Sequence, residues 1–372
     1  MTEQKKMAQQ KQQASPKTPG AKIQSSSSVS VEPEAVSIDL AQARLESAAR
    51  VVFRDPRVRS LGITRNGEGF GYRAVRNSAM ITPEKGFAQS SFVNDFGIPV
   101  TYVDTPHELE HQLKVPHSGP GAPAASSHVL EQDRARPLVS GLQIQNYDDD
   151  ARTGAIGQGY IVIGTIGCFV DLADNSVALL SNNHVVAGEN RGINGTDRIQ
   201  QPGASNLIAG DLVGILQNFI PLQTSPTGAS VATGNVLLNQ VDAGVAILQA
   251  GVTYAQGFLP TRALTAPNGT ASANVGDKVF KVGRTTGLTH GQVMDIGTIV
   301  GPIVYDPGSC WFEQSLTIEG ENGTMFSDKG DSGSIIVRED GMIVGLLYAG
   351  NGAQTYACPI DLVFSALQCT LH

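Results

Sequence analysis

Short apolar runs separated by turn-forming residues fill the chain after Pro137, and this pattern restricts the fold more than any other feature. Glycine is abundant, with 42 residues, and charged residues make up only 16 % of the chain, whereas helix-rich chains usually carry more charge. Many short strands joined by Gly, Asn, Asp or Pro are typical of a β-barrel or sandwich. The apolar runs lie at residues 160–170, 177–180, 212–219, 236–238, 244–248, 278–283, 291–300, 310–318, 334–338 and 342–348.

A serine flanked by glycine lies near the C-terminus, where residues 329–334 read Lys-Gly-Asp-Ser-Gly-Ser ahead of an apolar run. Such a serine can sit on a tight turn with its hydroxyl exposed. Because Gly330 has no Cβ, its N–H can point into the same space as the N–H of Ser332. Two converging amides can form an oxyanion hole, which stabilises the tetrahedral intermediate of acyl transfer. Taken alone, the motif also fits an ordinary hairpin turn.

A serine nucleophile needs a base, and the base needs an orienting group. The apolar segment 177–180 is followed by a polar turn at 181–183, and His184 comes directly after this turn. Asp242 lies just before the apolar run 244–248. Taken singly, His184 fits a surface histidine and Asp242 fits a turn former. Taken together with Ser332, in the order His, Asp, Ser, they predict a catalytic triad.

At five segments the sequence resembles the chymotrypsin-like (trypsin-like) serine peptidases of the bacterial, intracellular kind. Within that group it is most similar to peptidases that resemble the plant NARROW LEAF protein. The resemblance spans residues 137–372. The matching segments are residues 167–170 leading to 180–184, 200–203, 241–246, 282–291 and 330–334.

This resemblance implies two six-stranded antiparallel β-barrels, with His184 and Asp242 on the first barrel and Ser332 on the second. Residues 359–367 would form the C-terminal helix that closes the fold. The implied activity is that of a serine endopeptidase, which hydrolyses peptide bonds through an acyl-enzyme intermediate. The catalytic residues would be His184, Asp242 and Ser332, and the amides of Gly330 and Ser332 would form the oxyanion hole. No metal and no cofactor is expected.

The resemblance also suggests where substrate side chains bind. Phe326 would form the floor of the primary pocket, and Tyr348, Ala349 and Gly350 would form its wall. A floor without a carboxylate favours small or medium apolar side chains over Lys or Arg. Phe326 fits a plain core residue equally well. Arg284 could brace the second barrel or be an ordinary exposed arginine.

Composition divides the chain into four parts. Residues 1–34 are predicted to be a disordered tail, because they hold little that could form a core. Residues 35–105 predict a small α/β module, with helical spacing near 36–51 and strands near 58–64, 71–79 and 98–103. Residues 106–136 are predicted to be a linker. Its four histidines are irregularly spaced, which favours a solvated linker over a metal site. Residues 137–372 would be the peptidase domain.

Charge and cysteine usage limit the partners. A net charge of −8 without any basic block argues against nucleic acid, and no apolar run reaches the roughly 20 residues of a membrane span. The first residues lack the apolar core of a signal peptide, so a cytoplasmic location with reduced cysteines is expected. The expected partner is a polypeptide substrate, with self-association or a regulatory partner acting through the N-terminal module. The alternative is a catalytically weak or latent homologue that acts as a peptide-binding scaffold until a partner releases it.

Overall fold

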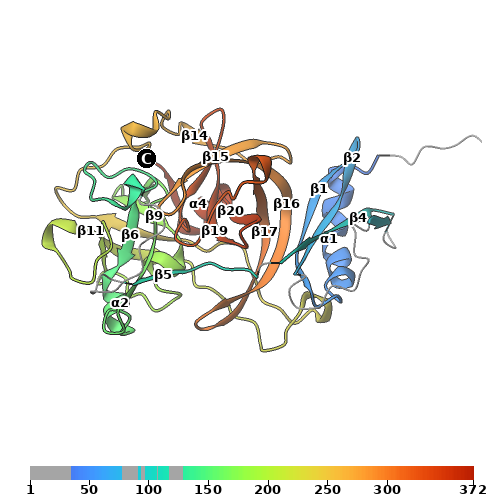
Figure 1. The fold of residues 1–372 in the computed structure, drawn as a ribbon, viewed down its shortest axis with the longest axis horizontal. Helices are drawn as coiled ribbons and strands as arrows, with labels where there is room; N and C mark the ends of the chain where they lie inside the picture. Colours follow the sequence, from blue (N-terminus) through green and yellow to red (C-terminus); the bar gives the residue numbers. More distant parts are fainter. Residues whose placement is uncertain (1–34, 78–90, 94–96, 107, 117–128) are drawn as a thin grey trace, which may run out of the picture. The chain divides into compact units, whose positions relative to one another are not determined.

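A computed structural model describes residues 35–77, 91–93, 97–106, 108–116 and 129–372 (Figure 1). The predicted tail at residues 1–34 lies outside the described residues. The described chain is mainly β and contains two sheets, one of twelve strands and one of nine. The prediction of a mainly β fold is therefore confirmed.

The nine-stranded sheet is antiparallel and carries the first half of the candidate site. Its strands follow one another in the order β21-β8-β9-β13-β11-β10-β6-β7-β5. Phe169, Leu179, Leu216 and Ala246 pack inside it with no exposed surface. The strands are β5 (Leu113–Pro116), β6 (Gln143–Asn146), β7 (Tyr160–Thr165), β8 (Phe169–Leu172), β9 (Val177–Ser181), β10 (Arg198–Gln200), β11 (Leu212–Phe219), β13 (Gly244–Leu248) and β21 (Cys369–Leu371).

The twelve-stranded sheet carries the second half of the candidate site. Its main path is β12-β17-β20-β19-β18-β15-β16-β1-β2-β4-β3, and β14 pairs with β19 outside this path. The strands are β1 (Val58–Asn66), β2 (Gly69–Asn77), β3 (Ser91–Val93), β4 (Pro99–Thr105), β12 (Leu238–Asn239), β14 (Gly269–Thr270), β15 (Lys278–Gly283), β16 (Gly287–Tyr305), β17 (Gly308–Gly320), β18 (Ile335–Arg338), β19 (Met342–Gly350) and β20 (Gln354–Pro359).

The helices are few and short. The α-helices are α1 (Ile38–Val52), α2 (Tyr147–Arg152), α3 (Asn183–Val186) and α4 (Ile360–Leu367), and the 3-10 helices are η1 (Leu130–Gln132), η2 (Ala209–Asp211), η3 (Val231–Thr233), η4 (Pro260–Arg262) and η5 (Glu321–Gly323). Helix α4 follows β20 where a C-terminal helix was predicted. None of the described helices is long and apolar enough to cross a membrane.

The predicted α/β module at residues 35–105 continues the twelve-stranded sheet. Helix α1 is capped by Ser37, whose hydroxyl accepts a hydrogen bond from the amide of Leu40 at 3.2 Å, as is typical of an N-cap. One face of α1 packs on β1, as its buried alanines indicate. Strand β1 in turn pairs antiparallel with β16, with Ser60 opposite Val300. The helix and strands predicted here are present, and they share a sheet with the rest of the chain (Figure 1).

Residues 106–136, predicted as a linker, contain regular structure. Strand β5 pairs antiparallel with β7, and η1 carries the buried Glu131, which binds Arg262 through two contacts of 2.6 Å. Strand β5 thus adds to the nine-stranded sheet, as β1–β4 add to the twelve-stranded one.

Candidate active site

The pairing of β9 with β13 brings His184 and Asp242 together. Gly244 at the start of β13 lies opposite Ser181 at the end of β9, so Asp242, two residues before β13, meets the helix α3 that follows β9. His184 Nδ1 lies 2.6 Å from Asp242 Oδ2, and the His184 amide donates to Asp242 Oδ1 at 3.2 Å. Both side chains are buried. The structure therefore places these two predicted residues in direct contact.

Asp242 is held as a carboxylate by the groups that surround it. Burial alone would raise the pKa of this carboxyl, but the charge and hydrogen bonds of His184 and the hydroxyl of Tyr305 outweigh burial and lower the pKa below its usual range. The Tyr305 hydroxyl donates to Asp242 Oδ2 at 3.0 Å. Such a carboxylate can fix the tautomer and orientation of the His184 ring.

Ser332 lies on a turn between β17 and β18 of the twelve-stranded sheet, and this turn contacts β7 of the nine-stranded sheet. Gly330 and Gly333 on either side have φ values of 96° and 94°, which favour glycine. The amide of Thr165, at the end of β7, donates to the Ser332 carbonyl at 2.9 Å, and the Thr165 hydroxyl donates to the Gly330 carbonyl at 2.8 Å. Among the described residues, the amides of Gly330 and Ser332 have no acceptor. Two free amides next to the hydroxyl are what an oxyanion hole requires.

Gly333 allows the turn to approach the first sheet closely. A Cβ at this position would overlap the Ser181 hydroxyl and the Thr165 carbonyl oxygen. Because Ser181 ends β9 and Thr165 ends β7, any larger residue would push the serine turn away from the His184 side of the site.

A buried lysine, whose role the sequence analysis did not predict, stabilises the turn through an ion pair. Lys281 Nζ lies 3.2 Å from Asp331 Oδ2, and both side chains are completely buried. Asp331 also accepts the amides of Thr285 at 2.7 Å and Asp328 at 3.1 Å. Asp331 therefore shapes the turn that carries Ser332. Lys281 lies within an apolar strand. The presence of a buried lysine there is explained by its ion pair with Asp331, which is distant in sequence.

His111, predicted to be part of a solvated linker, lies in the site instead. The Ser332 hydroxyl donates to the His111 carbonyl oxygen at 2.8 Å. The His111 ring stacks on Tyr305 with 4.0 Å between centroids and meets the His184 ring edge-on at 5.2 Å. His184 Nε2 is buried and has no hydrogen-bond partner within the described part of the chain. His111 thus contacts the residues of the site from both sheets.

The predicted pocket residues divide into two groups. A small cavity of about 20 Å³ beside Ser332 is lined by Ala349 and Gly350, and also by Asp328 and Lys329. Tyr348 is buried, and its hydroxyl bonds to Ser315 at 2.8 Å. The Phe326 side chain is buried in a hydrophobic cluster with Val279, Val293, Leu316, Ile318 and Leu347 and does not line this cavity. Of its two predicted roles, this position corresponds to the core residue.

Arg284 is neither exposed nor confined to the second sheet. Its Nε donates to the Gln143 side chain of β6 at 2.7 Å, so it links the two sheets. Burial lowers the pKa of this guanidinium to about 10. The four cysteines, Cys168, Cys310, Cys358 and Cys369, are buried free thiols.

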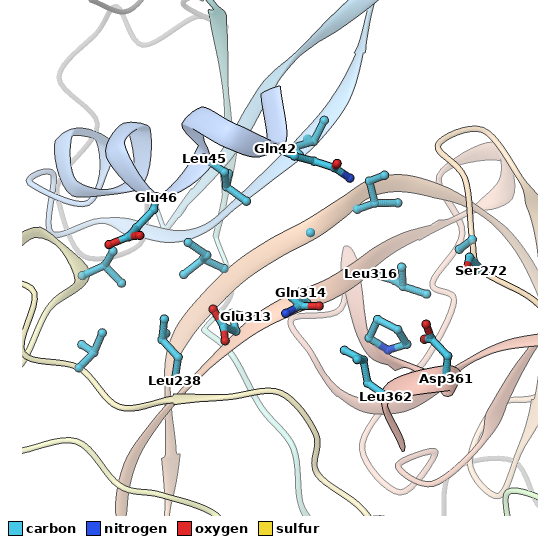
Figure 2. Close-up of a pocket in the computed structure, with 18 of the residues that line it drawn as sticks. Gln42, Leu45, Glu46, Leu238, Ser272, Glu313, Gln314, Leu316, Asp361 and Leu362 are labelled. Atoms are coloured by element: carbon cyan, nitrogen blue, oxygen red, sulfur yellow. The ribbon is translucent and has the colours of Figure 1, made fainter. Parts of the chain in front are cut away.

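A larger groove lies away from these residues. Figure 2 shows this groove, of about 730 Å³, between α1 and the strands β16 and β17. Its lining includes Leu45, Glu46, Leu238, Glu313 and Leu362 but none of the predicted site residues. The candidate active site is therefore the region around Ser332 and not this groove.

The chain has recognisable relatives in part of its length. The family model described as the Nal1 C-terminal domain matches residues 263–357, a segment that contains Ser332 and follows His184 and Asp242. No curated protein matches the sequence.

Among solved structures, the chain is similar to the Nocardiopsis protease NAPase, with a TM-score of 0.41 and 14 % identity over 63 % of this chain and 98 % of that chain. It is similar to the chymotrypsin of Cellulomonas bogoriensis, with a TM-score of 0.37 and 18 % identity over 56 % of this chain and 90 % of that one. A glutamic acid-specific serine protease is similar with a TM-score of 0.40 and 16 % identity, over 63 % of this chain and all of that one (100 %).

Proposed function

We propose that the protein is a serine endopeptidase of the chymotrypsin-like type. The observation that carries the proposal is the buried His184–Asp242 pair, which lies together with Ser332 around one residue, His111. A carboxylate-oriented imidazole, a serine on a glycine turn and two free amides are the groups that acyl transfer needs.

In this mechanism, His184 Nε2 takes the hydroxyl proton as Ser332 Oγ attacks a peptide carbonyl carbon. The carbonyl oxygen becomes an oxyanion and is bound by the amides of Gly330 and Ser332. His184 then gives the proton to the leaving amine. In the second half of the reaction, His184 takes a proton from a water molecule that attacks the acyl-enzyme, and returns it to Ser332 Oγ. Asp242 stays ionised and stabilises the protonated imidazole.

The substrate is proposed to be a polypeptide with a small or medium apolar side chain next to the cleaved bond. Ala349 and Gly350, which line the small cavity beside Ser332, support this preference. A peptide library tests it. Efficient cleavage after Arg with poor cleavage after Ala, Val or Leu would contradict it.

A second candidate function is a latent or catalytically weak homologue that binds peptides. One observation favours it: the Ser332 hydroxyl donates to the His111 carbonyl, and His184 Nε2 is unpaired among the described residues. In this arrangement the serine and the histidine are not joined by the hydrogen bond that activates the nucleophile.

A fluorophosphonate probe tests the first candidate, because it needs an activated serine but no knowledge of the substrate. We expect labelling of the wild type that is lost in Ser332→Ala and His184→Ala. Ser365→Ala, which changes an exposed serine on α4, is the matched control and should label normally. Loss of any triad residue should lower turnover by about 10⁴-fold. Labelling that persists in Ser332→Ala would overturn the assignment.

A further inference from the structure

Residues 108–112, called the strap below, cross the candidate active site between two strand pairings. At one end, the Glu110 amide donates to the Gly350 carbonyl at 2.7 Å, and the Gly350 amide donates to the Glu110 carbonyl at 2.9 Å. This antiparallel bridge attaches the strap to the end of β19. At the other end, β5 begins at Leu113 and pairs antiparallel with β7. The strap is therefore fixed to both sheets (Figure 1).

The strap contacts the nucleophile in a geometry that does not suit cleavage. The Ser332 hydroxyl donates a hydrogen bond to the His111 carbonyl oxygen, so its proton is not directed at His184. A peptide in position for attack would place a carbonyl oxygen on the amides of Gly330 and Ser332. Those amides have no acceptor among the described residues. The strap thus occupies the site without presenting a bond to be cut.

The His111 side chain anchors the strap. Its Nε2 lies 2.9 Å from Glu189 Oε1, and the side chains are only 10 % and 1 % exposed. Burial lowers the pKa of His111 despite this partner, and a neutral ring can still donate one hydrogen bond to the carboxylate. Glu189 is fixed on its other oxygen by the Asp306 amide at 2.5 Å. The ring therefore occupies a built position between Tyr305, His184 and Glu189.

Glu110 adds a charged contact at the rim. Its carboxylate lies 2.8 Å from Lys329 Nζ, with the two side chains 52 % and 39 % exposed. An exposed ion pair of this kind adds little stability by itself. Because Lys329 directly precedes Gly330, its positive charge favours a carboxylate next to this turn.

We propose that the strap is an internal ligand of the peptide-binding cleft, which keeps substrate out at rest. It is displaced by an extended polypeptide that carries a carboxylate near Lys329 followed by an imidazole or aromatic ring near Glu189 and Tyr305. The ligand would pair as a strand with the Gly350 end of β19, beyond the residues that pair with β18, in the place that Glu110 now takes. This inference rests on the proposed function, because it names what competes for the same cleft.

The variant Glu110→Pro tests the strap directly. Proline has no N–H, so the bond to the Gly350 carbonyl is lost together with the ion pair to Lys329. We expect the fluorophosphonate to label Ser332 about tenfold faster than in the wild type. We also expect faster hydrogen exchange at the Gly350 amide. Glu108→Pro is the matched control: it also removes an ion pair, to Arg59 at 3.1 Å, but the amide of Glu108 makes no hydrogen bond among the described residues.

Two further measurements keep the test independent of this one variant. His111→Ala keeps the backbone but removes the ring from Glu189 and Tyr305, and it should also label faster. A capped peptide with the strap sequence, Glu-Leu-Glu-His-Gln, should slow the labelling of Glu110→Pro at millimolar concentration. The same peptide with proline at its second glutamate should not.

The outcomes separate this inference from the proposed function. Faster labelling with faster Gly350 exchange supports both proposals. Equal labelling rates and equal Gly350 exchange in the wild type, Glu110→Pro and His111→Ala would overturn the strap and leave the peptidase proposal standing. If no variant is labelled but Gly350 exchange still rises in Glu110→Pro and the peptide suppresses that rise, the strap stands and the peptidase proposal fails.

Discussion

Lys281 and Asp331 form an ion pair in which neither side chain reaches solvent, with 3.2 Å between Nζ and Oδ2. The same ammonium group donates to the Gly287 carbonyl at 3.0 Å and contacts the Thr286 hydroxyl. The positive charge that holds the serine turn thus comes from Lys281 of strand β15. The ion pair therefore forms without any covalent change to the chain.

Removal of one partner of this pair should be costly. Lys281→Met leaves the Asp331 carboxylate buried without its cation, so we expect a loss of about 3–5 kcal/mol in the free energy of unfolding. Denaturant unfolding measures it. Lys278→Met changes an exposed lysine of the same strand and should alter stability by less than about 0.5 kcal/mol. Equal stability of the two variants would mean that the ion pair does not hold the turn.

Gly333→Ala should weaken the junction between the sheets. The new Cβ would be strained at a φ of 94° and would also overlap Ser181 and Thr165. Gly195→Ala is a control for the backbone alone, because Gly195 has a φ of 74° with no atom near the added Cβ. We expect a loss of about 1–2 kcal/mol at Gly195 and about 1–3 kcal/mol more at Gly333, measured by thermal or denaturant unfolding. Equal losses would argue against the close approach.

Tyr305→Phe should destabilise the fold in a pH-dependent way. The hydroxyl bonds to the Asp242 carboxylate and helps to keep the pKa of Asp242 low, so the pKa should rise in the variant. A carboxyl with a lowered pKa stabilises the fold above its ordinary pKa of 3.8, and this stability is lost as the pH falls through the lowered value. The cost of Tyr305→Phe should therefore be about 1.5–3 kcal/mol at pH 6 and smaller near pH 3.

Tyr348→Phe provides the comparison for this pH series. Its hydroxyl bonds to Ser315, which does not titrate, so its cost should stay constant between pH 6 and pH 3. A constant cost for Tyr305→Phe as well would mean that this hydroxyl does not stabilise the charged form of Asp242.

Asp150 should have the opposite pH dependence. Burial raises the pKa of Asp150 to about 7, although the Val162 amide donates to it at 3.0 Å. Because its pKa is higher in the folded state than the ordinary 3.8, the folded state binds more protons between these values, and stability falls as the pH rises from about 4 to 7. Asp150→Asn should remove this slope, which can reach about 1.4 kcal/mol per pH unit.

Asp148 is the neighbouring control. Its hydrogen bonds to Arg198 lower the pKa of Asp148, so Asp148→Asn should lose stability above about pH 4 rather than gain it. Unfolding curves at several pH values measure both variants. A loss of stability at neutral pH in Asp150→Asn as well would contradict the burial argument for Asp150.

Local patterns in the sequence were sufficient to predict most strands, the helix at α1 and the positions of His184, Asp242 and Ser332. These features depend on spacing within a few residues or on short motifs, and a single chain contains that information. The contact of His111 with Ser332 joins residues 221 positions apart and depends on the path of the strap, which composition does not encode. A segment rich in Pro, Gly, Ser and His looked solvated because its own residues could form no core.

The pairing of β1 with β16 was also beyond local patterns. The run at 58–64 predicted a strand, but strand order depends on which apolar faces meet in space. Similarly, Phe326 could be a pocket floor or a core residue until its neighbours were known. Each of these questions depends on residues distant in sequence, whereas the order of His184, Asp242 and Ser332 could be read along the chain.

The pairing of β1 with β16 has a practical consequence for shortened forms of the protein. A chain that began near residue 137 would lose β1 along residues 296–300 of β16 and β5 along β7. Both strands would then present rows of unpaired amides and carbonyls, which invite edge-to-edge association with other copies. Removal of the N-terminal residues should therefore produce aggregates. A single substitution in the strap, such as Glu110→Pro, should displace the strap from Ser332 without exposing these strand edges.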